Sequence, residues 1–210
     1  SYSGADVSNY SITNHADVAA NITAKSLTVS GITASSKTYD GSVTATMDGT
    51  SAVYSGLVSG DTFTGSYTGV FSNANVGTGK TVTITSSYSG ADSGNYTVTD
   101  QSSTTADIST KALTATASAS NKTYDGATTA TTTLTFTGLV GSETLGQTVG
   151  STFDNKNVGS NKTVTVNSIT LANGSNGGLA ANYSISAGQT TTANITPKAL
   201  TVSGITASNR

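Results

Sequence analysis

The sequence is unusual first for what it lacks. Its 210 residues include no cysteine and no tryptophan, and only one proline, one histidine and one methionine. Without cysteine, a small disulfide-stapled scaffold is excluded, although an extracellular location is not. No run reaches the roughly 20 apolar residues that a membrane-spanning helix needs, so we expect no transmembrane segment. Charged residues make up 10% of the chain and the net charge is −2, which gives no basic patch for nucleic acid.

The scarcity of catalytic residue types argues against an enzyme. His15 is the only histidine, so a Ser-His-Asp arrangement would have to be built around it. Glu143 is the only glutamate, and hydrolysis by paired carboxylates would need two aspartates brought together. Zinc has no plausible ligand set. We therefore expect no catalytic residue, no cofactor-binding residue, no metal ligand and no cofactor.

The chain contains an internal repeat of about 86 residues. The segment that begins Lys25-Ser-Leu-Thr returns at Lys111 and again at Lys198, at spacings of 86 and 87 residues. Such a period indicates an array of structural units. We expect residues 1–23 to be the C-terminal part of a preceding repeat, 24–109 and 110–196 to be complete repeats, and 197–210 to be the first strand of a following repeat. Ser1 does not open a signal peptide, so the chain resembles a window cut from a longer protein.

Several short motifs recur in the same order in both complete repeats. A residue that recurs in each copy is expected to serve the fold of each copy, whereas a residue that serves chemistry would more often occur once. The paired motifs are Lys37-Thr-Tyr-Asp-Gly41 with Lys122–Gly126, Gly56-Leu-Val58 with Gly138–Val140, Asn75-Val-Gly77 with Asn157–Gly159, and Asn95-Tyr96 with Asn182-Tyr183.

The pattern of polar and apolar residues predicts strands throughout. Residues 81–84 and 163–166 alternate with period 2, as half-buried strands do. Seven short strands per repeat, with turns every 8–12 residues, predict tandem Ig-like β-sandwiches, although no Cys pair or Trp marks a true immunoglobulin domain. A β-grasp-like or solenoid arrangement remains the alternative. The strands expected in the first repeat are 25–34, 42–47, 51–56, 61–71, 80–88, 95–100 and 104–109.

The junction between the repeats is short in the sequence. No glycine occurs from Thr104 to Thr116, so the last strand of one repeat is expected to lead almost directly into the first strand of the next. The only proline, Pro197, falls at the next junction. A short linker restricts hinge motion, and the sequence therefore predicts an extended, semi-rigid rod.

Of three recurring motifs, two allow both a functional and a structural interpretation, and the third is interpreted as structural only. Tyr39-Asp40-Gly41 could hold calcium or a ligand, but the sparse acids favour a turn in which Asp caps the backbone and Gly takes positive φ. Asn75-Val76-Gly77 is expected to be a turn built on left-handed Asn or Gly. Asn95-Tyr96 and Asn182-Tyr183 could bind sugar, or could form a corner in which the tyrosine hydroxyl bonds the backbone.

Two covalent modifications are also compatible with the sequence. Lysines recur at positions where Lys–Asn or Lys–Asp isopeptide bonds could form, although Arg210 replaces Lys37 and Lys122 and so excludes that position as a required cross-link. Asn-x-Ser/Thr triplets could accept glycans if a matching transferase exists. The recurring lysines are Lys25, Lys111 and Lys198 with Lys80 and Lys162, and the triplets begin at Asn9, Asn21, Asn95, Asn121, Asn161, Asn182 and Asn194.

Taken together, the motifs make the chain resemble the YDG repeat of very large bacterial surface exoproteins, many of them similar to filamentous haemagglutinin. The resemblance covers essentially all 210 residues. It implies a secreted or cell-surface adhesin, exported through an outer-membrane transporter. The second copy departs from the pattern by inserting residues 173–178 before its Asn-Tyr.

Two functions follow as expectations. The first is a structural stalk, or a building unit of a filament or biofilm matrix, in which exposed edge strands could also pair neighbouring chains. The second is a low-affinity module for glycan or another surface that gains by avidity. An aromatic cluster confined to loops would favour the second.

Overall fold

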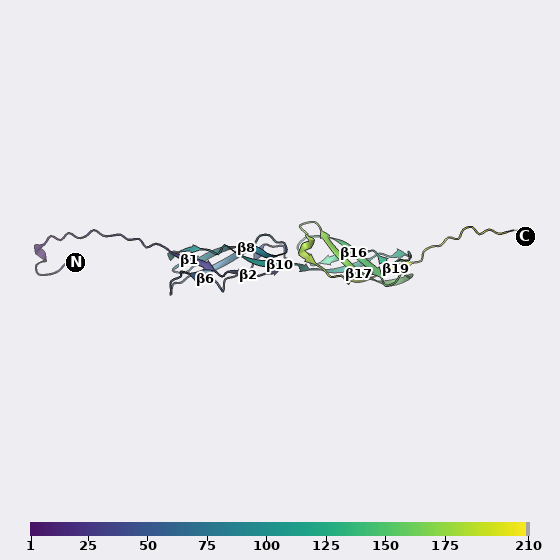
Figure 1. The fold of residues 1–210 in the computed structure, drawn as a ribbon, viewed down its shortest axis with the longest axis horizontal. Coiled ribbons are helices and arrows are strands. Elements are labelled where there is room, and N and C mark those ends of the chain that lie inside the picture. The colour runs from purple at the N-terminus through teal and green to yellow at the C-terminus, as the bar shows by residue number, and fades with distance from the viewer. Residues whose placement is uncertain (209–210) are drawn as a thin grey trace.

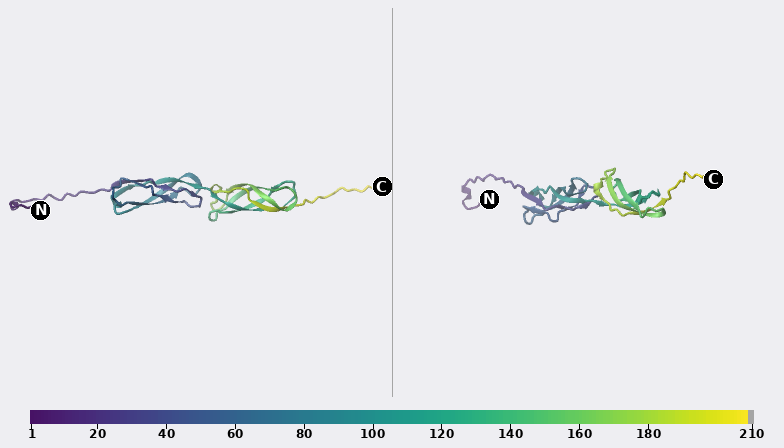
Figure 2. Two further views of the ribbon diagram at one scale, coloured as in Figure 1. Left: turned by 90° about the horizontal axis from the view of Figure 1, so that it is seen from below. Right: turned by 45° about the vertical axis from the view of Figure 1, so that its right-hand side comes forward.

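The computed structural model describes residues 1–208 and contains two β-units arranged end to end. Figure 1 shows the units in line along the long axis, with the two termini at opposite ends, and both views of Figure 2 keep this arrangement. We call residues 24–109 the first repeat and residues 110–196 the second repeat. The described residues form strands and three short 3-10 turns, and they include no α-helix. The all-β tandem arrangement expected from the sequence is therefore confirmed.

The first repeat is built from two main sheets that pack against each other. One sheet has three strands in the order β6-β1-β9, the other has five in the order β3-β10-β8-β7-β4, and β2 pairs with β5. The strands are β1 Lys25–Ser30, β2 Thr33–Ala34, β3 Lys37–Thr38, β4 Thr44–Ala45, β5 Met47–Asp48, β6 Val53–Ser55, β7 Thr64–Phe71, β8 Gly77–Ser89, β9 Tyr96–Thr99 and β10 Ser103–Ser109, with the 3-10 turn η2 at Ser93–Asn95.

The second repeat has the same plan. Its five-stranded sheet runs β13-β19-β17-β16-β14, and its opposite layer consists of the pairs β11-β18 and β12-β15. These layers make both repeats sandwich-like. The strands are β11 Lys111–Ala112, β12 Thr114–Ala119, β13 Lys122–Thr123, β14 Thr129–Ala130, β15 Thr132–Thr137, β16 Leu145–Phe153, β17 Gly159–Asn173, β18 Tyr183–Ser184 and β19 Thr190–Thr196, with η3 at Ala180–Asn182.

Most strands lie where the alternating pattern predicts them, but two predicted strands are interrupted. The stretch 42–47 divides into β4 and β5, which pair in different sheets. The stretch 25–34 divides into β1 and β2 at Gly31, which has a φ of +83°. A Cβ at Gly31 would lie 2.4 Å from the Ser51 carbonyl oxygen, so the chain can turn there only with glycine. The short strand β3 was not predicted, because two residues carry no measurable period.

The predicted first strand of a following repeat is not formed. Residues 197–208 have no regular structure, and Leu200 and Val202 are exposed. The counterpart of this segment, β1, pairs with β6 and β9, which come later in the repeat. Arg210, predicted to replace Lys37, lies outside the described residues. In the leading segment, the local turn η1 (Val7–Asn9) forms and residues 11–24 do not pair.

The hydrophobic core is continuous from one repeat to the next. Residues from the five-stranded sheet of the first repeat, including Phe71 and Ile108, form one buried cluster together with Leu113 and Tyr183 of the second repeat. The equivalent cluster of the second repeat, around Phe153 and Ile195, contains no residue from another repeat. Burying apolar surface across the boundary makes the two units one packed body rather than two tethered ones.

Candidate functional site: the junction between the repeats

The junction is short and leaves little room for a hinge. Strand β10 ends at Ser109 and β11 begins at Lys111, so only Thr110 separates the last strand of one repeat from the first strand of the next. This confirms the short linker expected from the sequence. The contacts between the two repeats around Thr110 are made by residues of the recurring motifs.

Tyr39 of the first repeat inserts its ring into the second repeat. Only 4% of Tyr39 is exposed, and its ring meets that of Tyr183 edge to face, with centroids 5.4 Å apart. Its hydroxyl donates to Glu143 Oε1 at 2.6 Å. The Tyr183 hydroxyl donates to the other carboxylate oxygen of Glu143, also at 2.6 Å, and accepts the Val140 N–H at 2.9 Å. One carboxylate thus holds one tyrosine from each repeat.

A second polar contact lies beside the tyrosines. Asn182 is 1% exposed, and its Oδ1 accepts the Val76 N–H at 3.0 Å across the junction. Its amide nitrogen donates to Asn75 Oδ1 at 3.1 Å. The Asn-Val segment of the first repeat is therefore hydrogen-bonded to the asparagine of the Asn-Tyr motif in the second repeat. A buried amide satisfied in this way fixes the geometry, because each alternative leaves a polar group without a partner.

The glycine of the Tyr-Asp-Gly motif meets one requirement in both repeats and a second requirement at the junction only. Gly41 has a φ of +77°, and a Cβ there would lie 2.8 Å from Val140 Cγ1 of the second repeat. Gly126, its counterpart at the far end, has a φ of +84° and open space around it. The turn needs glycine for its backbone in both repeats, and the junction additionally needs its small size.

A lysine fixes the turn that presents Tyr39. Lys37 Nζ donates to Asp40 Oδ1 at 2.8 Å, to the Ser42 carbonyl at 2.7 Å and to the Thr44 carbonyl at 3.1 Å. The ammonium also lies 5.5 Å from the centre of the Phe71 ring. Asp40 Oδ1 in turn accepts the Ser42 N–H at 2.8 Å. This confirms the capped-turn interpretation of Tyr-Asp-Gly.

The second repeat reproduces this arrangement at its far end. Lys122 Nζ contacts Asp125 Oδ1 at 2.8 Å and lies 5.6 Å from the Phe153 ring centre. The Lys122 ammonium, together with the Ala127 N–H, holds the pKa of the Asp125 carboxyl below its ordinary value. The negative charge of this carboxylate is already balanced by the lysine ammonium. Within residues 1–208 no group of three or more His, Cys or acidic side chains is placed to hold a metal ion.

Removal of the lysine should loosen the turn. We expect Lys37→Met to lower the free energy of unfolding by about 1–2 kcal/mol, because hydrogen bonds from a charged donor to two carbonyls and a carboxylate are lost. Lys25→Met, at an exposed position, should stay within about 0.5 kcal/mol of the parent. Urea denaturation measures both, and equal effects of the two variants would contradict this role for Lys37.

The corner interpretation of Asn-Tyr is confirmed, and the predicted form of the Asn-Val-Gly turn is wrong. Tyr96 and Tyr183 both accept a backbone N–H, from Val58 and Val140. Positive φ occurs two residues after the Asn-Val-Gly glycines, at Gly79 and Asn161. The preceding turn is instead closed by side chains: the N–H groups of Asn75 and Asn157 donate to the carboxamides two residues earlier.

Other candidates from the sequence lie elsewhere. His15 is exposed in the unpaired leading segment, and Glu143 belongs to the junction. Among the recurring lysines, Lys80 and Lys162 donate to Asn73 and Asn155 Oδ1, each at 2.8 Å. These are hydrogen-bonded Lys–Asn pairs. A measurement of the intact mass would show whether these pairs form isopeptide bonds, because each Lys–Asn bond releases one ammonia.

The role of Glu143 was missed because sequence reasoning considered it only as a catalytic acid. The signal was nevertheless there: Asp61 and Glu143 stand at the same repeat position, five residues after the glycine of Gly-Leu-Val. Asp61 accepts a hydrogen bond from Tyr96, as Glu143 does from Tyr183. A recurring acid in a chain with so few charges marks a structural task.

The tyrosine–carboxylate contact makes the junction sensitive to alkali. Burial, followed by the hydrogen bond to Glu143, raises the pKa of Tyr39 to about 12. The stabilisation from the neutral phenol is fully present below the ordinary tyrosine pKa of about 10 and is lost as the pH rises through 12. Tyr39→Phe should therefore be less stable than the parent at pH 9, and this difference should shrink above pH 10. A difference that stays constant from pH 9 to 12 would contradict the contact.

The fold and the junction define a class of protein: an all-β tandem repeat protein whose repeats interlock end to end. The chain belongs to the YDG domain family, whose family model matches residues 23–106 and 109–193. The matched ranges coincide with the two repeats to within a few residues. Comparisons with curated proteins and with solved structures gave no match. No helix among residues 1–208 is both long and apolar enough to cross a membrane.

Proposed function

We propose that this chain is a structural segment of an extracellular bacterial adhesin or surface fibre, and that it acts as a semi-rigid stalk. The interlocked junction carries the proposal. A segment that only linked two active domains would need neither a shared core nor three side chains, Tyr39, Glu143 and Asn182, committed to holding its repeats in line. When repeats are held in line in this way, each added repeat lengthens the stalk.

Several further features support the stalk. The surface of each strand is rich in Ser and Thr, and the chain carries few charges, so contacts within the rod depend little on salt. The long strands β8 and β17 run along the axis of their repeats (Figure 1). On the family resemblance, we also propose that the chain is exported to the cell surface through an outer-membrane transporter. There it would take part in adhesion or in a biofilm.

Antibodies raised against this chain test its location. They should label intact cells of the bacterium that encodes it, and protease treatment of those cells should remove the label. Labelling that requires permeabilised cells would overturn the surface assignment. A cytoplasmic marker probed on the same cells serves as the control for lysis.

The second function, the glycan- or surface-binding module, rests on aromatic residues that occur in one repeat only, although three of the four lie on strands and not in loops. The first repeat has an aromatic group made of Tyr54, Phe63, Tyr67 and Tyr88, whereas the aligned or equivalently paired positions in the second repeat hold Phe136, Leu145, Val149 and Leu171. These rings pack against the core around Leu27, and the Tyr54 and Tyr67 hydroxyls lie 2.9 Å apart. Glycan-array binding that is lost in Tyr67→Ala or Tyr88→Ala would favour this module over the passive stalk.

A further inference from the structure

The first and last parts of each repeat lie side by side and run in the same direction. In the first repeat we call residues 25–38 the entry stretch and residues 96–109 the exit stretch. Strand β1 of the entry stretch pairs with β9, and β3 pairs with β10. Both pairs are parallel, and in both the partner residue lies 71 residues further along the chain. The two stretches therefore keep the same register at both ends of the repeat.

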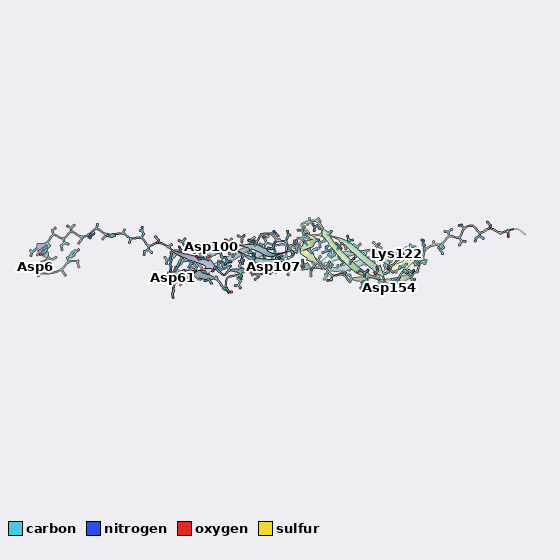
Figure 3. The ribbon with its side chains drawn as sticks, in the orientation of Figure 1. Asp6, Asp61, Asp100, Asp107, Lys122 and Asp154 are labelled. Atoms are coloured by element: carbon cyan, nitrogen blue, oxygen red, sulfur yellow. The ribbon has the colours of Figure 1, made fainter. Side chains whose placement is uncertain are left out.

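Tension along the chain would pull these two stretches in opposite directions. The chain enters the first repeat at the start of β1 and leaves it at the end of β10, beside the second repeat (Figure 1). Figure 3 shows Asp100 and then Asp107, both in the exit stretch, progressively nearer to the second repeat. A pull on both ends of the repeat slides the stretches past each other. The evenly spaced hydrogen bonds between parallel strands are then loaded together rather than one after another.

Side chains add hydrogen bonds between the stretches where the strands themselves do not pair. The Gln101 carboxamide accepts the Ile32 N–H at 2.9 Å and donates to the Ile32 carbonyl at 2.7 Å. Ser36 Oγ accepts the Asp107 N–H at 3.0 Å. Together with the two parallel strand pairs, these bonds join the entry stretch to the exit stretch at the start, in the middle and at the end of the repeat.

The second repeat has the same two parallel pairs but no side chain at the position of Gln101. Strand β11 pairs with β18 and β13 pairs with β19, at offsets of 72 and 73 residues. Gly188 stands where the first repeat has Gln101. A cavity of about 550 Å³ opens there between residues 112–115 and 184–189. The β11–β18 pair covers two residues of each strand, whereas the β1–β9 pair covers four.

We propose that the paired entry and exit stretches form a clamp that bears tension along the chain, and that Gln101 makes the clamp of the first repeat the stronger one. The clamp lies on the shortest bonded path between the residue where force enters a repeat and the residue where it leaves. Only Thr110 separates β10 from β11, so tension on one clamp passes directly to the next. Such a clamp concerns the response to force, and its failure would leave the surface location, which the antibodies test, unaffected.

Constant-force measurements on the whole chain test the direction of loading. The chain has no cysteine, so two introduced cysteines define the pulling points. Thr23→Cys with Thr110→Cys pulls the first repeat in shear, whereas Thr23→Cys with Asn95→Cys peels β1 from β9 beginning at its first residue. All three positions are exposed. At equal force the sheared repeat should survive at least about tenfold longer than the peeled one. Equal lifetimes in the two geometries would overturn the proposal.

A variant of Gln101 tests the bonds in the middle of the clamp. Gln101→Ala removes both bonds to Ile32 and should shorten the lifetime under shear about tenfold. Under peeling, the pairs at the start of β1 break while Gln101 is still bonded, so that lifetime should change by less than about twofold. Equal shortening in both geometries would mean that Gln101 adds only general stability, which contradicts its place in the clamp.

Two further variants keep this test secure. Ser36→Ala changes an exposed residue, so folding should persist, and the loss of its one bond to Asp107 should shorten the shear lifetime about threefold. Asp48→Ala is the matched control, because Asp48 also accepts two hydrogen bonds, both from Thr50, but lies outside both stretches. Its shear lifetime should stay within about twofold of the parent. A control effect as large as that of Gln101→Ala would assign the loss to overall stability and contradict the clamp.

Pulling on the two ends of the chain compares the repeats directly. Each unfolding event should lengthen the chain by roughly 250–300 Å. We expect two events at different forces, the weaker one from the second repeat. Gln101→Ala should lower the force of the stronger event and leave the weaker one unchanged. A variant that lowers the weaker event instead would contradict the proposed order of the two clamps.

Discussion

Tyr39→Ala should lower the free energy of unfolding by about 3 kcal/mol, whereas Tyr124→Ala should cost only about 1 kcal/mol. The two tyrosines occupy the same motif and the same turn, and their backbones make the same hydrogen bond. They differ in their surroundings: Tyr39 is 4% exposed, lies against Tyr183 and donates to Glu143, while Tyr124 is half-buried at the distal side of the second repeat. The difference between the two losses in free energy of unfolding therefore measures how much the contacts of Tyr39 across the junction stabilise the protein.

Chemical denaturation followed by circular dichroism gives both values. Tyr39→Ala should also change the shape of the transition, because removing the ring opens the core that the two repeats share. The parent should unfold in one transition and the variant in two. Equal losses for Tyr39→Ala and Tyr124→Ala, with a single transition in each, would mean that the ring serves only its own repeat.

The second large effect is expected at Asn182. Asn182→Ala should cost about 2 kcal/mol, since it leaves the half-buried Val76 N–H and the Asn75 carboxamide without their partner across the junction. Asn95→Ala changes the corresponding residue at the exposed proximal end and should stay within about 0.5 kcal/mol of the parent. The pair is a matched comparison, because both asparagines close the same 3-10 turn.

Hydrogen exchange locates the effect of Asn182→Ala. Protection of the Val76 amide should fall, while protection at Val82 in the middle of β8 should persist. Unchanged protection of the Val76 amide would show that water replaces the carboxamide without a cost in free energy. Asn182 would then not stabilise the junction.

The sequence was sufficient to predict the repeat, most of the strands and the shortness of the linker. Each follows from local information: the return of Lys-x-Leu-Thr after 86 residues, the alternation at 81–84, and the absence of glycine from Thr104 to Thr116. The capped turn at Asp40 and the bonded hydroxyl of Tyr96 could also be predicted, because turn and corner chemistry depend on few residues.

The partner of each motif could not be predicted. Tyr39 and Glu143 lie 104 residues apart and belong to different repeats, and no local period relates them. The recurring motifs were attributed to the fold of each copy, but the structure gives several of them a second task in joining copies. Gly41 illustrates this, since its φ could be expected from the turn while its contact with Val140 could not.

The division of the predicted strand 25–34 has a similar cause. Gly31 was counted within the predicted strand 25–34, and the Ser51 carbonyl, which leaves no room for a side chain at this turn, comes from 20 residues further along the chain. Long-range contacts decide such details, and a single sequence does not display them.

The central claim is that the two repeats form one rigid body through the junction. Residual dipolar couplings measured on the whole chain in a weakly aligning medium test it most directly. One alignment tensor should fit the amides of both repeats, and Tyr39→Ala, but not Tyr124→Ala, should require two. Two tensors of unequal magnitude in the parent protein would contradict the account, since they would show repeats that turn independently about Thr110.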